Sequence, residues 1–135
     1  VQAILDRLVR DTKDLAALGI ASVAISSNDA SAYPEDSFPR MKEAAEAHRF
    51  PFPYLYDESQ EVARRYGAVC TPDFFGFNRD LALQYRGRLD ESGRSPGPAG
   101  ARRELVEAMT AVARTGRGPE HQVPSMGCSI KWKDA

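Results

Sequence analysis

GAVCTPDFFGFN, residues 67–78, places a cysteine and a threonine directly before a proline and then enters an apolar run. Proline has no backbone N–H, so Pro72 is tolerated where a strand begins but not inside a central strand. An X-Pro bond also adopts the cis form at modest cost. The stretch therefore predicts a turn at Thr71-Pro72, with the bond either cis or trans, followed by a strand over residues 74–77.

The segments after this strand predict a hairpin, a closing helix and a tail. Asn78-Arg79-Asp80 is a turn, and LALQYR after it reads as the second strand of an antiparallel hairpin. The next helix ends at Gly116 and has its apolar side formed by Leu105, Val106, Met109, Val112 and Ala113. Residues 117–135 have no strong periodicity and are predicted to be a C-terminal tail.

The segments before Thr71-Pro72 alternate between helical and strand patterns. The first 18 residues predict a helix that is already under way at Val1, and its apolar stripe contains Ile4, Leu5, Leu8, Val9, Leu15 and Leu18. Gly19 is its predicted C-cap, and Ile20 to Ser27 predict a buried strand.

A second helix and strand follow, and then a third helix. Asp36 or Ser37 is the expected N-cap of the helix that contains Met41, and Tyr54 to Tyr56 predict a short strand. DESQ, residues 57–60, is typical of a capping box in which Gln60 reaches back to the start of a helix that ends near Gly67. The whole order indicates an α/β protein with an antiparallel pair toward its C-terminal end.

Composition excludes several classes of partner. The 135 residues suit one domain, and Lys plus Arg number 18 against 19 for Asp plus Glu, so no net charge favours nucleic acid or an anionic membrane surface. No apolar run approaches the roughly 20 residues of a membrane-spanning helix. We therefore expect small molecules or proteins as partners, with no nucleic acid and no membrane.

The cysteines and histidines do not form a metal-binding pattern. Cys70 and Cys128 are far apart, and His48 and His121 are isolated, whereas structural zinc ligands come in closely spaced pairs. Two cysteines are also too few for a disulfide framework. We expect no metal.

Four stretches carry a resemblance to a known family: SSNDASAYPEDSFPRM, YDESQEVARRYGAVCTPDFFGF, YRGRLDES and PSMGCSIKW. They resemble the peroxiredoxin-like branch of the thioredoxin superfamily, the AhpC/TSA or redoxin-domain proteins. The resemblance implies a thioredoxin-like fold with a central mixed sheet flanked by helices. Residues 1–116 would form this domain, entered at its first long helix, and residues 117–135 would be an extended tail packed on it.

The same resemblance implies where the site lies. A cis-proline after a small or hydroxyl residue sits beside the redox cysteines of the thioredoxin fold, so Thr71 and Pro72 are expected to bind substrate. The family's redox cysteines belong to a Cys-Asn-His-Cys-Pro type segment, which is expected upstream of Val1. Within this chain Cys70 is the first candidate redox thiol and Cys128 the second, as a resolving thiol. The alternative for each is a small packed residue without a redox role.

The implied function is cysteine redox chemistry, as a thiol-disulfide oxidoreductase or a peroxiredoxin-like antioxidant protein. Peroxiredoxins use an arginine near the position of Cys70-Thr71, and its absence favours disulfide exchange. The expected substrate is a thiol or disulfide protein or a small peroxide, reduced with a thioredoxin-type partner and without any metal or organic cofactor. The alternative is a redox-silent module that holds an extended peptide at the cis-proline groove.

Three further expectations remain open at this stage. Arg86 and Arg88 form either a basic lip for an anionic partner or hairpin charges paired with Asp90 and Glu91. A sheet that lacks its central strand would favour a homodimer. The compartment is expected to be the cytoplasm, or the periplasm if a signal lies upstream.

Overall fold

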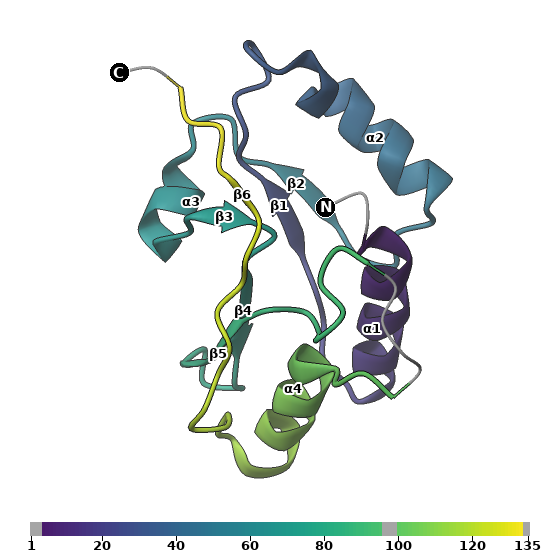
Figure 1. Cartoon of the computed structure of the whole chain (residues 1–135), viewed down its shortest axis with the longest axis vertical. Coiled ribbons are helices and arrows are strands. Elements are labelled where there is room, and N and C mark those ends of the chain that lie inside the picture. The colour runs from purple at the N-terminus through teal and green to yellow at the C-terminus, as the bar shows by residue number, and fades with distance from the viewer. Residues whose placement is uncertain (1–3, 96–99, 134–135) are drawn as a thin grey trace.

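The computed structural model describes residues 4–95 and 100–133, which form a mixed α/β fold (Figure 1). The predicted helix start at Val1 lies outside the described residues. In chain order the elements are α1 (Leu5–Ala17), β1 (Ala24–Ser26), the 3-10 helix η2 (Pro34–Asp36), α2 (Phe38–Ala47), β2 (Tyr54–Tyr56), α3 (Glu61–Tyr66), β3 (Cys70–Thr71), β4 (Phe74–Phe77), β5 (Leu83–Gly87), α4 (Glu104–Thr115) and β6 (Cys128–Ser129).

The strands of the described residues pair in twos. β1 and β2 are parallel, with Ile25 opposite Leu55, whereas β4 and β5 form the predicted antiparallel hairpin. β3 pairs with β6 in an antiparallel ladder. The prediction of an α/β protein with a mixed arrangement of strands is therefore confirmed, and β6 is a strand that the sequence pattern does not predict.

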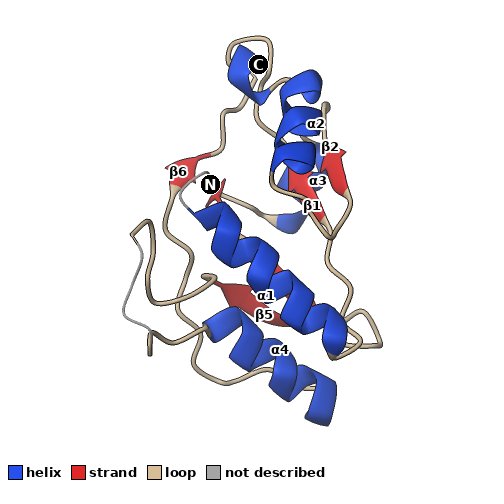
Figure 2. Cartoon of the chain, turned by 90° about the vertical axis from the view of Figure 1, so that its right-hand side faces the viewer, coloured by secondary structure: helices blue, strands red, loops and turns tan. Residues whose placement is uncertain are grey.

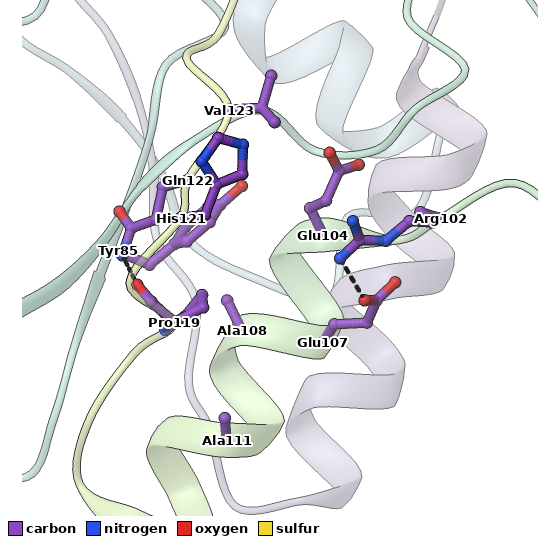
Figure 3. Close-up of a pocket in the computed structure, with 10 residues that line it drawn as sticks. All are labelled: Tyr85, Arg102, Glu104, Glu107, Ala108, Ala111, Pro119, His121, Gln122 and Val123. Carbon is purple, nitrogen blue, oxygen red and sulfur yellow. Dashed lines mark hydrogen bonds and ion pairs between the residues drawn. The ribbon is translucent and has the colours of Figure 1, made fainter.

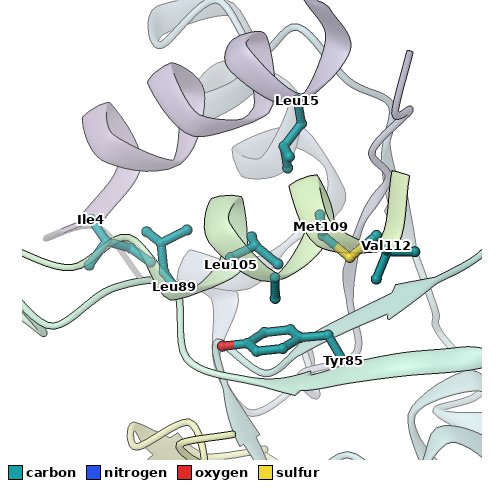
Figure 4. Close-up of a cluster of buried hydrophobic side chains, with 8 residues drawn as sticks. Ile4, Leu15, Tyr85, Leu89, Leu105, Met109 and Val112 are labelled. Atoms are coloured by element: carbon teal, nitrogen blue, oxygen red, sulfur yellow. The ribbon is translucent and has the colours of Figure 1, made fainter. Parts of the chain in front are cut away.

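The main hydrophobic core lies between α1, α4 and the hairpin. α1 and α4 run side by side, with β5 behind them (Figure 2). Tyr85 of β5 is 1% exposed and lies under the apolar side of α4 (Figure 4). The buried cluster consists of Ile4, Leu15, Tyr85, Leu89, Leu105, Ala108, Met109 and Val112. The apolar stripes predicted for the first and last helices therefore meet each other and the hairpin.

A buried carboxylate also joins α1 to the start of α4. Asp11 is fully buried and accepts hydrogen bonds from the Arg103 guanidinium at 2.6 Å and from Arg10 at 2.9 Å. Arg103 also contacts Asp14 at 2.6 Å. A buried charge is tolerated only when it is paired in this way.

The first strand is shorter and more exposed than predicted. It covers Ala24–Ser26 rather than Ile20 to Ser27, and Val23 and Ile25 are 57% and 43% exposed. The prediction of a buried strand is wrong because, among the described residues, β1 pairs only with β2. Its β-branched residues match strand geometry without being covered on both faces.

The start of α3 differs from the predicted capping box. Gln60 does not reach back; its amide donates to the backbone oxygens of Ser27 at 2.7 Å and Lys131 at 2.9 Å. The Asp57 carboxylate instead accepts from the backbone N–H of Ala63 at 3.0 Å. Gln60 is used elsewhere because the end of β1 and the tail each bring a backbone carbonyl oxygen within its reach. The preceding helix α2 does begin as predicted, with Ser37 as its N-cap.

The hairpin and the end of α4 follow their sequence signals. The Asn78 side chain accepts hydrogen bonds from the N–H groups of Asp80 and Ala82, both at 3.0 Å, and so closes the turn. Gly116, at φ +80, ends α4. Residues 117–133 then run past β5 and β3 toward α3, as the yellow end of the ribbon shows (Figure 1). The tail thus crosses the region that contains Thr71-Pro72.

Candidate functional site

Thr71 and Pro72 lie in a short segment between α3 and β4. Gly67, at φ +69, ends α3 and turns the chain toward β3. The Thr71-Pro72 peptide bond is cis, and β4 begins two residues after Pro72, at Phe74. The predicted turn at Thr71-Pro72 and the strand after it are therefore both present.

The C-terminal tail forms a ladder with the residues before this proline. Thr71 lies opposite Cys128, and Cys70 lies opposite Ser129. Directly opposite residues project from the same face of a ladder, and successive residues project from opposite faces. Cys128 therefore shares a face with Thr71, and Cys70 projects from the other face.

This register separates the two candidate thiols. Cys70 and Cys128 are both free, and their side chains leave opposite faces of the ladder. A disulfide requires Cβ atoms about 4 Å apart with converging directions. A direct Cys70–Cys128 bond would require β6 to leave its register.

The tail contacts Thr71 through the tail's own backbone atoms, at Gly127 and Cys128. A Cβ atom placed on Gly127 would overlap the Thr71 carbonyl oxygen and lie 2.9 Å from the Thr71 carbonyl carbon. The Thr71 hydroxyl is 3.4 Å from the carbonyl oxygen of Cys128, to which it donates. Glycine is thus required at position 127 because the two chains approach too closely for a side chain.

Cys70 lies in a partly buried environment that favours the protonated form of its thiol. Its sulfur lies 3.6 Å from the carbonyl oxygen of Pro72 and 3.8 Å from that of Ser125. Burial raises the pKa of the Cys70 thiol, the negative charge of Asp73 raises it further, and Arg86 opposes both. A thiol with a raised pKa is a weak nucleophile near neutral pH. Cys128, by contrast, is exposed.

The arginines after β4 pair differently from the prediction. Arg86 contacts Asp73 at 3.1 Å, donates to the Gly67 carbonyl oxygen at 2.7 Å and lies over the Phe75 ring. Arg88 contacts Glu104 at 2.6 Å. The predicted pairing with Asp90 and Glu91 is therefore wrong, because the hairpin carries both arginines away toward other elements. Arg86 fixes the segment that leads into Thr71-Pro72.

A separate cavity of 220 Å³ lies between β5, α4 and the tail (Figure 3). Its wall includes His121 and an Arg102–Glu107 ion pair of 2.9 Å. It contains none of Cys70, Thr71, Pro72 and Cys128. It is therefore not part of the cis-proline site.

No group of three or more His, Cys, Asp or Glu side chains in residues 4–95 and 100–133 is arranged to hold a metal ion. No helix in the same part of the chain is long and apolar enough to cross a membrane.

Comparison with known proteins identifies the family. The model of the AhpC/TSA family matches residues 1–86. This range ends within β5 and includes the cis bond between Thr71 and Pro72. The chain belongs to the AhpC/TSA family. The match confirms the peroxiredoxin-like, thioredoxin-superfamily resemblance, and with it a peroxiredoxin-like redox role in general terms.

Two solved structures resemble this AhpC/TSA chain along its whole length. An uncharacterized conserved protein from Geobacillus kaustophilus is 50% identical with a TM-score of 0.92, and the match covers 100% of this chain and 71% of that one. A hypothetical protein from Sinorhizobium meliloti 1021 is 41% identical with a TM-score of 0.93, covering 100% of this chain and 74% of that one. No curated protein matches the chain.

The structure of this AhpC/TSA chain adds residues that sequence reasoning missed. Gly127, Ser125 and Gln60 all take part in holding the tail across the site. Only the glycine directly before Cys128 gives a signal in the sequence, since Gly marks places where backbones approach closely. The contacts of Ser125 and Gln60 depend on segments far apart in the chain.

Proposed function

We propose that this AhpC/TSA protein catalyses thiol-disulfide exchange at the surface formed by Thr71, Pro72 and Cys128. In this proposal Thr71 and Pro72 form the substrate-side wall, and Cys128 is the resident redox thiol. The observation that carries it is the register of β3 with β6. This register places the exposed Cys128 directly opposite Thr71, the first residue of the cis peptide bond, and on the same face of the ladder.

The exchange step needs no group beyond thiols and a disulfide. A protein thiolate attacks one sulfur of the substrate disulfide; a new S–S bond forms, the original S–S bond breaks, and the other sulfur leaves as a thiolate. A second thiol then attacks the mixed disulfide and releases the remaining half. In the family's pattern the principal redox cysteines precede α1, and Cys128 would act as their resolving partner. A thioredoxin-type reductant would return the electrons.

Peroxide reduction is the closest variant of this chemistry. There a thiolate attacks one oxygen of the peroxide: an S–O bond forms, the O–O bond breaks, the thiol becomes a sulfenic acid, and the other oxygen leaves as hydroxide or alkoxide and takes up a proton. The segment before β4 offers threonine and proline, and its arginine neighbour, Arg86, is already paired with Asp73. A paired guanidinium has fewer free donors for a peroxide, so disulfide exchange is preferred.

Cys70 takes a supporting role in this proposal. Its sulfur is in contact with two backbone carbonyl oxygens, and burial raises the pKa of its thiol. It would pack behind Thr71-Pro72 rather than attack a substrate. This reverses the order in which the sequence ranks the two cysteines.

The rival function is a redox-silent module that holds an extended peptide. The tail itself is an extended segment held beside Thr71, so the surface is suited to a strand. The two functions differ in what Cys128 does. An activated thiol reacts faster than an ordinary one, whereas a packing residue does not.

The test measures the rate at which the protein forms a mixed disulfide with glutathione disulfide, and intact-mass spectrometry monitors the reaction. We expect the folded Cys70→Ala chain to gain one adduct faster than the same chain in urea at the same pH. The matched Cys128→Ala chain should react more slowly when folded than in urea. If folded Cys70→Ala reacts no faster than its unfolded form, Cys128 is not activated and the binding module becomes the better description.

A further inference from the structure

The tail that carries Cys128 is fixed on both sides of the site. We call residues 117–133 the tail strap. Before the site, the Arg88 N–H donates to the Val123 carbonyl oxygen at 3.0 Å, and the Ser125 hydroxyl donates to the Gly87 carbonyl oxygen at 2.7 Å. These contacts attach the strap to the end of β5.

The second attachment lies beyond the site and is buried. Gln60 is 1% exposed; its amide nitrogen donates to the Lys131 carbonyl oxygen at 2.9 Å, and its amide oxygen accepts from the Lys133 N–H at 3.0 Å. The Asp29 N–H also donates to the Lys131 carbonyl oxygen, at 2.8 Å. The Arg64 guanidinium lies 5.2 Å from the centre of the Trp132 ring. The strap is therefore held by several elements rather than lying loose.

Between these attachments the strap fills the edge of β3. Cys128 is paired with Thr71, and Gly127 approaches the Thr71 carbonyl so closely that a single Cβ atom would not fit. A peptide that binds by strand addition must pair its main chain with such an edge. No second strand has room between the strap and Thr71.

We propose, on the basis of the proposed redox function, that the tail strap closes this edge to extended peptides and that the substrate is a low-molecular-mass disulfide. A small disulfide does not need strand pairing, because it has only to bring one sulfur to the exposed Cys128 thiol. The strap thus determines specificity by occupying the place of a protein substrate.

The experiment compares peptide binding before and after the strap is loosened. The peptide is a fluorescent synthetic copy of residues 124–132 with serine in place of its cysteine, so that it cannot cross-link. Gly127→Val should push the strap off β3 because its side chain would overlap Thr71. The paired substitutions Gln122→Ala and Ser125→Ala, which remove two attachments near β5, give a second variant should the first fail to fold.

We expect fluorescence anisotropy to show peptide affinity at least about tenfold tighter for the loosened variants than for the unmodified chain, which corresponds to recovering one or two main-chain hydrogen bonds. The unmodified chain should still form its mixed disulfide with glutathione disulfide. Equal peptide affinity in the unmodified and loosened chains overturns the inference and leaves the redox function standing. Loosened variants that fold but bind no peptide overturn it as well. Failure of the unmodified chain to react with glutathione disulfide overturns the proposed function together with the inference.

Discussion

Cys128 lies directly opposite Thr71 in an antiparallel ladder, although 57 residues separate them in the chain. The next peptide bond after Thr71 is the cis bond to Pro72. The exposed Cys128 is thereby held beside the cis-proline segment, where we propose that the site lies. Cys70 projects from the opposite face and is less exposed than Cys128, so we expect the two cysteines to react at different rates.

The pKa of the Cys70 thiol should be higher in the folded chain than in the unfolded chain, and its two charged neighbours should shift it in opposite directions. Burial raises the pKa of its thiol, Asp73 raises it further, and Arg86 lowers it. In a Cys128→Ser chain, the pH at which iodoacetamide alkylation reaches half its maximal rate should be higher for the folded than for the urea-unfolded protein. Asp73→Asn should lower this midpoint and Arg86→Met should raise it. Shifts of the same sign in both variants would show that these charges do not act on the thiol.

The same raised pKa has a consequence for stability. The folded chain keeps a proton that the unfolded chain loses first, so the contribution of Cys70 is complete below the unfolded pKa and is lost as pH rises through the folded pKa. Urea unfolding of the Cys70→Ala chain should therefore show a smaller alkaline decline in the free energy of unfolding than the parent chain. An identical decline would contradict the assignment.

Asp57→Ala should destabilise the protein because it removes the acceptor at the start of α3. Burial acts to raise the pKa of Asp57, but hydrogen bonds from the Ser27 hydroxyl and from the N–H groups of Ala63 and Val62 outweigh it, and the pKa is lowered. Loss of such a cap costs about 1–2 kcal/mol in the free energy of unfolding.

The effect of Asp57 should also depend on pH. Because its folded pKa is lowered, its contribution is present above the unfolded value of about 4 and is lost as pH falls through the folded pKa. Urea titrations at neutral and acidic pH should show the Asp57→Ala deficit shrinking on acidification. The exposed neighbour Glu58→Ala is the control and should change stability by less than about 0.5 kcal/mol. A deficit that stays constant with pH would mean that the carboxylate charge is not the cause.

Gly76→Ala should disturb the core although it adds one methyl group. A Cβ atom at Gly76 would overlap the Met109 sulfur and lie 3.2 Å from the Met109 methyl carbon. Overpacking of this kind lowers the free energy of unfolding by about 1–3 kcal/mol. Gly100→Ala is the matched control, since nothing lies within 4 Å of its added Cβ. Thermal melts of the two variants should separate clearly, and equal melting temperatures would mean that Met109 moves aside freely.

Tyr85→Phe should lower the free energy of unfolding by about 1 kcal/mol, because it removes the buried hydroxyl that donates to the Arg88 carbonyl oxygen at 2.6 Å. Burial first, and then the charge of Glu104, raise the pKa of Tyr85 to about 12. Its contribution is therefore present below the unfolded pKa of about 10 and is lost as pH rises through the folded value. The parent chain should lose stability over this range more steeply than Tyr85→Phe in urea titrations. Tyr66→Phe, at a residue that is 46% exposed, is the control and should change the free energy of unfolding by less than about 0.5 kcal/mol.

The local signals of this sequence determined most of its elements. The apolar stripe of the first helix up to Leu15, the Asn78 turn and the stop at Gly116 each correspond to the observed structure, because period, turn chemistry and positive φ are properties of short stretches. Leu18, which the pattern also placed in this stripe, is 48% exposed. The run from Gly67 to Asn78 placed Thr71 and Pro72 between α3 and a strand for the same reason. With the matching motifs, it also indicated the family.

The tertiary structure alone decided which distant groups meet. Asp11 meets Arg103, Gln60 turns away from its own helix to the tail, and Gly127 lies on Thr71. None of these contacts has a local period, since each pairs segments that approach only after the core has packed. The placement of the two thiols was likewise set by the register of a two-residue strand. A shift of one residue in that ladder would place Cys128 on the same face as Cys70, which is why the sequence named both cysteines but could not say how they lie relative to each other.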